Sequence, residues 1–446
     1  MTLPPAFSYD DTCRHEKTQE YSAGDVASGN GMGFPTVIVI GGGPAGLFCA
    51  LRISGEGRKV VVLEKMPSCG RKLLLTGLGQ CNLTHDGDIR SFFEKYGDNG
   101  PFLRPALMNF TNQDLRAFCE EKGVPLGTME SGKIFPLSKK ASDVLSLLLR
   151  ECRIRGVEIC CNEAVLGVGI EEHTFFVQSQ NSIRHASFLV IATGGASYPG
   201  TGSSGDGYKM ARSLGHAIAP PAPALTPVYV KEYPFAHLAG ISFPHVTFYL
   251  FRRGKKIRES TGDLLFTHSG LSGPGILHLS RYIEAGDELK VSFLPGLSAA
   301  HLSRRIQEAA SAHGNRQVKA ILTGYGLPLR FVKGILTRAG LSETLTGAHL
   351  SKKDRDRLAA MVCAFPFPVS LLGGFDEAMV TRGGVSLCEI DSKTMESRVV
   401  RGLYCIGEVL DIDGDTGGYN LQAAFSTAAS ASRDIVSKTR ILPAGR

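Results

Sequence analysis

Several features that mark other protein classes are missing from this chain of 446 residues. No stretch approaches the roughly 18 to 20 consecutive apolar residues that a membrane-spanning helix needs, so we expect a soluble protein without a membrane partner. The first thirty residues contain no apolar core of a secretory signal. The 11 cysteines show no CxxC spacing, which favours reduced thiols in the cytoplasm and argues against a structural metal site.

The charge pattern excludes a dense nucleic-acid-binding arm. The chain has 49 Lys and Arg against 42 Asp and Glu, a formal charge of +7. The densest basic block, Arg252–Lys256, is more typical of a hairpin turn. The mild positive charge weakly favours anionic ligands, and nucleic acid is not an expected partner. The sequence leaves the oligomeric state open.

Glycine, in contrast, is abundant and clustered, with 53 residues in the chain. The most informative cluster is a GxGxxG motif at residues 41–46. It follows a continuous apolar run, Thr36–Ile40, and opens a helical pattern over 47–53; a second apolar run, Lys59–Leu63, ends at Glu64. This order of elements predicts a dinucleotide-binding βαβ unit: a strand, a glycine turn, a helix, a second strand and an acidic residue.

Each glycine of this motif has a distinct predicted role. Gly41 permits the tight turn, Gly43 lets the backbone approach a pyrophosphate, and Gly46 lets helix and strand pack closely. The helix N-terminus offers its N–H groups to the phosphates, and Glu64 can accept hydrogen bonds from both ribose hydroxyls.

The hydrophobic pattern predicts a discontinuous architecture. Residues 1–33 are polar and aperiodic and are interpreted as a flexible leader. One nucleotide-binding domain would then be built from both chain ends, residues 34–223 and 375–446. A β-rich insert would occupy 224–298 and 356–374, and it would carry a helical insert at 299–355.

Later glycine motifs favour FAD over NAD. Ala192–Gly195 closes a strand and resembles the second glycine motif of two-dinucleotide-binding-domain flavoproteins. Gly407-Glu408, followed by Asp411, resembles their third motif, and residues 417–421 open the last helix. A helix N-terminus at the flavin edge would stabilise negative charge on the reduced ring.

Two similar patterns are interpreted differently. Gly200-x-Gly202-x-x-Gly205 spells the same fingerprint, but no buried strand precedes it, so we expect a loop. Asp411-x-Asp413-x-Asp415 resembles the start of a calcium loop, but Thr416 and Gln422 stand where that loop requires Gly and Glu.

Four longer segments resemble one flavoprotein family. They are Cys69–Thr84, Leu265–Pro274, Gly383–Glu396 and Gly407–Asn420, and the similarity extends over about residues 35–435. On these motifs the chain resembles the BaiN-like flavoproteins, which include a 3-dehydro-bile-acid reductase and an aminoacetone oxidase. The resemblance implies an α/β fold in which a Rossmann-like FAD domain is interrupted by a β-barrel-like domain with a small helical insert. One departure is Gln80, where family members often have arginine.

The glycine motifs and the resemblance together predict the FAD contacts. These are Gly41, Gly43, Pro44, Ala45, Gly46, Glu64, Lys65, Arg71, Lys72, Thr76, Gly77, Gly79, Asn82, Val165, Thr193, Gly194, Gly407, Glu408, Asp411, Gly418, Asn420 and Leu421.

Three side chains are candidates for catalysis. Lys72 belongs to the glycine-flanked basic pair that would serve the pyrophosphate or the flavin edge. His268 lies in a Gly/Ser/Pro-rich loop of the insert that could reach the flavin, and Tyr198 is a further candidate. Cys81 is interpreted as a small packed residue.

The sequence predicts an FAD-dependent oxidoreductase acting on a small organic substrate between the flavin and the insert. NAD(P)H-linked reduction of an activated C=C bond is the first hypothesis, and oxygen-dependent amine oxidation is the alternative. A third hypothesis is an FAD-containing RNA- or protein-binding module that uses the basic helical insert. The residues concerned are Arg304, Arg305, Arg316, Lys319, Arg330, Lys333, Lys352, Lys353 and Arg355; a solvated helix surface explains them equally well.

Overall fold

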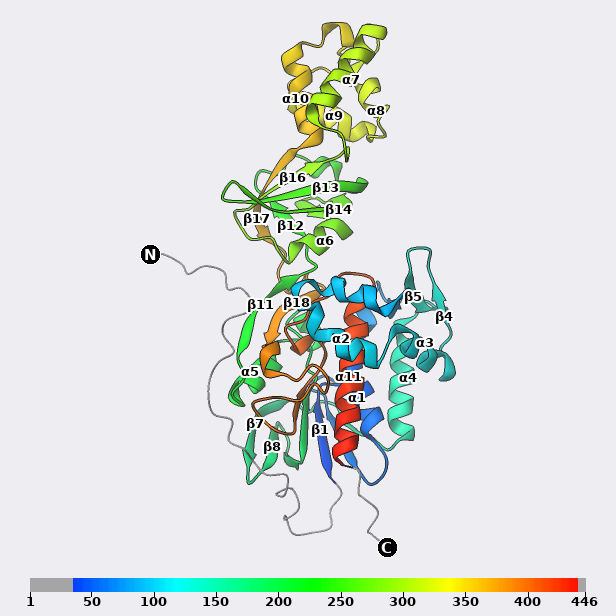
Figure 1. Cartoon of the computed structure of the whole chain (residues 1–446), viewed down its shortest axis with the longest axis vertical. Coiled ribbons are helices and arrows are strands. Elements are labelled where there is room, and N and C mark those ends of the chain that lie inside the picture. Colours follow the sequence, from blue (N-terminus) through cyan, green and yellow to red (C-terminus); the bar gives the residue numbers. More distant parts are fainter. Residues whose placement is uncertain (1–34, 440–446) are drawn as a thin grey trace, which may run out of the picture.

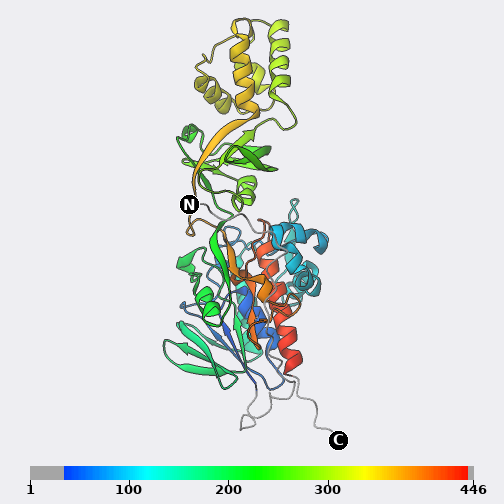
Figure 2. The ribbon, with the colours of Figure 1, turned by 60° about the vertical axis from the view of Figure 1, so that its left-hand side comes forward.

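The computed structural model describes residues 35–439, so the predicted leader at 1–33 lies outside the described part of the chain. The molecule is elongated, with three parts in succession along its long axis (Figure 1). A Rossmann domain lies at one end, a β-barrel follows it, and a bundle of helices forms the other end; Figure 2 shows the same order from another side.

The Rossmann domain is built on a parallel sheet of five strands in the order β19-β10-β1-β2-β6. The strands are β1 (Thr36–Ile40), β2 (Lys59–Leu63), β6 (Glu158–Cys160), β10 (Phe188–Ile191) and β19 (Leu403–Cys405). β1 is central and almost entirely buried, as its continuous β-branched sequence predicts for a strand covered on both faces. Helices α1 (Pro44–Ile53) and α11 (Tyr419–Lys438) pack against each other, so the two ends of the chain share one core.

Smaller elements surround this sheet. The helices are α2 (Gly100–Asn109), α3 (Asn112–Glu121), α4 (Ala141–Ile154) and α5 (Asp206–Ser213). A three-stranded sheet contains β3 (Thr84–His85), β5 (Lys133–Pro136) and β4 (Leu126–Thr128), and a meander contains β7 (Val165–Glu171), β8 (Thr174–Ser179) and β9 (Ile183–Ala186). Short 3₁₀ helices are η1 (Leu73–Leu75), η2 (Ile89–Asn99), η3 (Pro199–Thr201), η6 (Leu387–Glu389) and η7 (Gly407–Val409).

The predicted barrel is confirmed as a closed barrel of six strands in the order β12-β15-β14-β13-β16-β17. Its strands are β12 (Val228–Val230), β13 (Ser242–Arg252), β14 (Lys255–Phe266), β15 (Gly270–Ser272), β16 (Glu288–Ser292) and β17 (Phe365–Leu372). Helix α6 (Pro274–Ser280) follows β15, and the short η4 (Ala236–Leu238) precedes β13. The antiparallel pair β11 (Ile218–Ala224) and β18 (Val380–Val385) joins the barrel to the Rossmann domain.

The helical insert consists of α7 (Ala299–Ala312), α8 (Val318–Thr323), α9 (Leu329–Arg338), η5 (Gly347–His349) and α10 (Lys352–Cys363). The expected boundary at residue 355 falls inside α10, which continues to Cys363 and leads directly into β17. The insert therefore extends over residues 299–363. Sequence patterning missed the last two turns because the charges of α10 are grouped at 352–357 and its apolar residues at 358–363, so the apolar half resembles a continuation of the strand that follows it.

The barrel and the helical insert share one apolar core. Phe331 of α9 is buried against Phe293, with ring centroids 4.3 Å apart, and against Phe243 of β13 at 4.9 Å. The aromatic cluster continues through Phe266 and Phe367. Because the cluster takes rings from both parts, barrel and insert are stabilised as a unit. Among residues 35–439, no helix is long and apolar enough to cross a membrane.

Replacing Phe331 with alanine tests this shared core. Removal of a fully buried ring leaves a cavity, so we expect the free energy of unfolding to fall by about 3–5 kcal/mol. Chemical denaturation followed by circular dichroism measures the loss. Leu329→Ala, two residues away and half exposed, is the matched control and should change stability by less than about 1 kcal/mol. Equal effects of the two substitutions would contradict a common core.

Candidate cofactor and active site

The three glycines of the 41–46 turn occupy the three environments that the sequence predicts. Gly41 has a φ of +108°, and a Cβ there would lie 2.5 Å from the main-chain oxygen of Ala192. A Cβ on Gly46 would lie 2.0 Å from the oxygen of Gly41, so this residue allows the close packing of α1 on the turn. A Cβ on Gly43 would meet nothing within 4 Å. Gly43 thus leaves room for a bound group.

This open space is part of a large cavity. Its volume is about 720 Å³, within the range of small-molecule and cofactor sites. Sixteen of the predicted FAD contacts line it: Gly41, Gly43, Pro44, Ala45, Glu64, Lys65, Arg71, Lys72, Thr76, Val165, Thr193, Gly194, Gly407, Glu408, Asn420 and Leu421. They come from both ends of the chain, which the Rossmann fold brings together.

The N-terminus of α1 borders the cavity without a side-chain cap. Its cap residue is Gly43, and Pro44 occupies the first turn, where the missing proline N–H costs nothing. The remaining N–H groups of that turn and the positive end of the helix dipole favour a pyrophosphate at this position.

Glu64 is fixed at the end of β2 by the main chain. Its Oε2 accepts a hydrogen bond from the Gly42 N–H at 2.8 Å, and its Oε1 accepts one from the Met66 N–H at 2.8 Å. Each carboxylate oxygen retains a further lone pair, and Glu64 lines the cavity. The carboxylate therefore fits the ribose-binding role that its place after β2 predicts.

Two lysines of the cavity wall are held by carboxylates. Lys72 Nζ lies 2.7 Å from Glu408 Oε2 and 3.0 Å from Oε1, and Glu408 Oε1 also accepts from the Thr381 N–H at 2.9 Å. Lys65 Nζ pairs with Asp206 Oδ2 at 2.6 Å. Burial alone would raise the pKa of Asp206, but the hydrogen bond from Lys65, with a further one from a serine, lowers it below its ordinary value.

Several predicted contacts lie beside the cavity wall rather than in it. Asn82 suits its surroundings with its amide nitrogen donating to Thr84 O and its oxygen accepting from the Gly418 N–H, both at 3.2 Å. Asp411 Oδ1 accepts from the Gly383 N–H at 2.9 Å, and burial raises the pKa of Asp411. Gly77 and Gly79 have positive φ values in the loop that follows η1, and Gly46 packs against Gly41. These residues shape the loops that carry the wall.

The structure separates the three catalytic candidates. Lys72 lines the cavity. Tyr198 is half-buried with a left-handed backbone, its N–H bonded to Phe375 O, and it is not part of the lining. His268 is exposed in the turn between β14 and β15, next to Phe266, which packs toward the helical insert. Only Lys72 of the three borders the cavity.

Sequence reasoning also missed part of the wall. Thr201, Gly202 and Ser203 line the cavity, as do Lys209 and Met210 of α5. This segment contains the second glycine pattern, which forms η3 and a loop before α5, as predicted, rather than a second βαβ unit. The loop reaches the cavity because β10 ends beside the 41–46 turn, a proximity that sequence spacing does not reveal.

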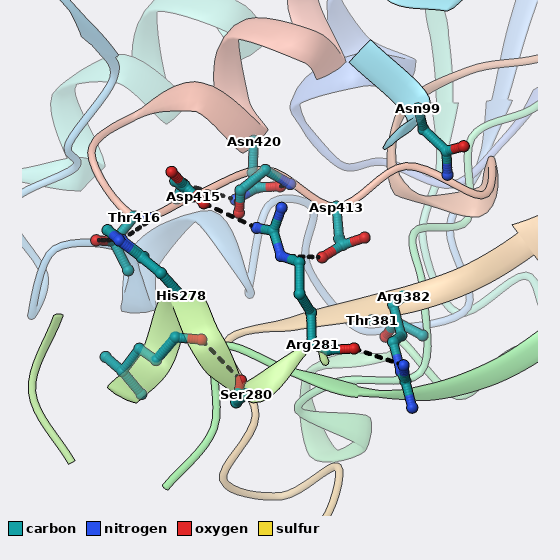
Figure 3. A network of polar contacts seen from close by, with 12 residues as sticks. Asn99, His278, Ser280, Arg281, Thr381, Arg382, Asp413, Asp415, Thr416 and Asn420 are labelled. Carbon is teal, nitrogen blue, oxygen red and sulfur yellow. Dashed lines mark hydrogen bonds and ion pairs between the residues drawn. The ribbon is translucent and has the colours of Figure 1, made fainter. Parts of the chain in front are cut away.

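A buried ion-pair network joins the barrel to the cavity wall (Figure 3). Arg281, directly after α6, is 7% exposed. Its Nη2 donates to Asp415 Oδ1 at 3.0 Å, and its Nε lies 3.1 Å from Asp413 Oδ2 without forming a hydrogen bond. Its main-chain oxygen accepts from Arg382 Nη1 of β18 at 2.6 Å. Burial raises the pKa of Asp413, against the opposing effect of Arg281.

His278 of α6 binds the same loop (Figure 3). Its Nε2 accepts from the Thr416 N–H at 3.1 Å and lies 2.7 Å from Thr416 Oγ1. Burial lowers the pKa of His278, so the imidazole is neutral and its Nε2 can accept. Asn420, which lines the cavity, binds Gly414 of this loop through both amide atoms, at 2.7 and 2.9 Å. Residues 413–416 thus connect the barrel to the start of α11.

Replacing Arg281 with methionine tests the network. The buried Asp413 and the half-buried Asp415 would lose the guanidinium between them, so we expect the free energy of unfolding to fall by about 3–5 kcal/mol. Adding Asp413→Asn and Asp415→Asn to the same variant should recover a large part of the loss. Lys256→Met, which removes an exposed pair with Glu259, is the control and should cost less than about 1 kcal/mol. Urea denaturation of all three variants decides the question.

The cavity, the glycine turn and the inserted barrel fit a nucleotide-binding site on a Rossmann domain. The chain belongs to the family described as HI0933-like protein Rossmann domain, which matches residues 35–434. This membership confirms the resemblance to flavoproteins that the sequence motifs indicated, and the chain is an FAD-dependent oxidoreductase of this family.

Curated relatives extend over nearly the whole chain. A ribosomal RNA dihydrouridine synthase of Escherichia coli (strain K12) is 33% identical over 407 residues, 90% of this chain and 97% of that protein. A 3-dehydro-bile acid delta(4,6)-reductase of Clostridium scindens is 31% identical over 404 residues, 89% of this chain and 97% of that protein. Among solved structures, an E. coli quinol fumarate reductase FrdA aligns with 92% of this chain and 71% of that chain, with a TM-score of 0.48 at 16% identity.

The substitution Gly43→Ala tests the cofactor site. The new methyl group would enter the open space at the start of α1 without touching protein, so the fold should persist while FAD binding weakens at least tenfold. Visible flavin absorbance per mole of purified protein measures the loss, and circular dichroism checks the fold. Gly374→Ala, also in open space but outside the cavity wall, should retain full flavin content. Equal flavin content in both variants would contradict a cofactor at Gly43.

Proposed function

We propose that this protein uses FAD to reduce a C=C bond conjugated to a carbonyl group, with NADPH or NADH as the electron donor. The observation that carries the proposal is that two relatives with different named substrates, both aligned over about nine-tenths of this chain, share one chemical change. A uracil ring becomes dihydrouracil when its C5=C6 bond, conjugated to C4=O, is saturated. A delta(4,6) double-bond system beside a 3-oxo group is conjugated in the same way.

This reaction adds a hydride to the carbon distant from the carbonyl and a proton to the carbon next to it. After the hydride is added and before the proton arrives, negative charge develops on the carbonyl oxygen. The site therefore needs a positive charge or hydrogen-bond donors beside that oxygen. When bound, FAD supplies the two-electron hydride chemistry. The protein has to hold the ring, orient the substrate and exclude water.

The described side chains suit these tasks. Glu64 and the start of α1 would hold the ribose and the pyrophosphate, leaving the flavin ring toward Lys72, Glu408 and the start of α11. Lys72 carries its ammonium group at the cavity wall, and Glu408 fixes it at 2.7 Å. There the positive charge can stabilise negative charge on the cofactor or on a substrate carbonyl.

Two classes of substrate carry a C=C bond conjugated to a carbonyl group. A small enone fits the expectation of a small organic substrate. A uracil base within RNA presents the same conjugated group, and the E. coli relative is named for that chemistry. Both alternatives use the same cofactor and the same reduction.

Anaerobic flavin reduction tests the electron donor. NADPH or NADH should bleach the visible flavin absorbance of the purified holoenzyme within seconds, and a subsequent enone or a uridine-containing RNA should restore it without oxygen. Lys72→Met should slow the second step at least tenfold, because it removes the cation from the cavity wall. Failure of both pyridine nucleotides to bleach the flavin, with bleaching by an amine and rapid reoxidation by oxygen, would contradict the proposal and favour the amine-oxidase alternative.

A further inference from the structure

The net charge of the chain is concentrated in its helical insert. Residues 299–363 contain 11 Lys and Arg but only four Asp and Glu, which gives +7, the formal charge of the whole protein. The remainder holds 49 minus 11 basic and 42 minus 4 acidic residues, or 38 of each. The rest of the chain is therefore neutral in sum, and the net positive charge of the protein equals that of the insert.

Six of these side chains form what we call the basic ridge: Arg304, Arg305, Arg316, Lys352, Lys353 and Arg355. Five are exposed and Arg355 is half-buried. Within the described chain, the only acidic partner of a ridge residue is Glu308, 3.9 Å from Arg304. Elsewhere in the insert, Lys333 and Arg357 are each paired with a carboxylate at 2.8 Å, a shorter contact than the one that Arg304 makes.

Main-chain and side-chain contacts bring the ridge together. The Gly347 N–H donates to Arg316 O at 2.9 Å, which places Arg316 beside the segment that leads into α10. Lys352 and Lys353 begin α10 a few residues later. Arg355 Nε donates to Ser303 Oγ at 3.0 Å, next to Arg304 of α7. The ridge thus follows the packed pair α7 and α10.

Helix stability does not account for these charges. Lys352 and Lys353 occupy the first turn of α10, where positive side chains oppose the helix dipole. Arg330 occupies the first turn of α9 in the same way. The apolar faces of the helices are already used in the core shared with the barrel. A ligand that carries many negative charges would explain both the excess of basic residues in the insert and their place in the first turns of its helices.

The position of the insert selects the kind of ligand. Figures 1 and 2 place it at the opposite end of the long axis from the Rossmann domain, with the barrel between them. A small substrate in the FAD cavity cannot touch the ridge, whereas a polymer can reach both. A membrane surface fits poorly, because Leu329 is the only large hydrophobic side chain of the insert that is strongly exposed.

We propose that the basic ridge is a docking surface for the phosphate backbone of RNA, which holds a uridine-containing segment while an unpaired or flipped uracil reaches the FAD cavity. The inference rests on the proposed C=C reduction and extends it to a macromolecular substrate. It replaces the expectation that nucleic acid is not a partner. That expectation considered only the density of charge along the sequence, and the ridge is assembled from three separate segments.

Salt-dependent binding of a uridine-containing stem-loop RNA to the holoenzyme tests the ridge. Each phosphate contact contributes about 0.7–0.9 to the slope of log affinity against log salt concentration. The variant Arg316→Gln/Lys352→Gln/Lys353→Gln should make this slope less steep by about 2–3 and weaken binding at least tenfold at low salt. The matched control Lys140→Gln/Arg153→Gln/Arg155→Gln removes three exposed charges of the Rossmann domain and should bind like the unmodified protein. Equal binding by both variants would overturn the proposal.

Two further measurements separate this proposal from the proposed function. NADPH-dependent reduction of a small enone should be unchanged in the ridge variant, because the ridge lies outside the cavity. Enone reduction without any RNA binding by the unmodified protein would overturn the docking surface alone. Ridge-dependent RNA binding without reduction of any C=C bond would overturn the proposed reaction and leave the surface standing. Ridge-dependent binding to phosphatidylserine vesicles instead of RNA would assign the surface to a membrane.

Discussion

The cofactor site depends on how closely helix α1 approaches the turn that precedes it. Gly46 lies against the main-chain oxygen of Gly41, and Gly41 lies against that of Ala192, at distances that leave no space for a side chain. This contact sets the start of α1 over the ends of β1 and β10. Gly43 and the first-turn N–H groups then face an open cavity of about 720 Å³. All other parts of the site are arranged around that helix terminus.

A second constraint connects the barrel to the same cavity. The barrel shares its apolar core with the helical insert, so these two parts move as one unit unless that core opens. Arg281 and His278, at and beyond the end of α6, bind the loop 413–416 from which α11 begins. A displacement of the barrel would therefore disturb Asn420 and the cavity wall. This coupling is sensitive to Arg281, because its guanidinium contacts both the buried Asp413 and the half-buried Asp415.

The cavity and the excess positive charge lie at opposite ends of the molecule, the cavity in the Rossmann domain and the charge on the helical insert. At the cavity wall Lys72 and Lys65 form ion pairs with Glu408 and Asp206. The helical insert carries the whole excess of positive charge on exposed helices. The proposed docking of RNA on the insert, with reduction of a uracil in the cavity, would use this division.

The sequence alone was sufficient for the Rossmann unit, for FAD and for sixteen residues of the cavity wall. These features depend on local patterns: an apolar strand, a glycine turn, a helix and an acid within 30 residues. Sequence also indicated the barrel and the insert through the family resemblance, although the end of α10 was missed because its apolar half, residues 358–363, runs without a polar residue into strand β17.

Tertiary structure alone decided which loops line the cavity and which histidine binds the loop before α11. His268 belongs to a family motif but is exposed, whereas His278, ten residues later, reaches Thr416 because α6 turns back toward the Rossmann domain. Arg281 and the wall segment 201–203 likewise act through contacts with residues far apart in the chain, and the basic ridge is assembled from three separate segments. The positions of these residues depend on contacts across domains and between helices. Such contacts are not encoded by the periodicity or spacing of residues along one segment.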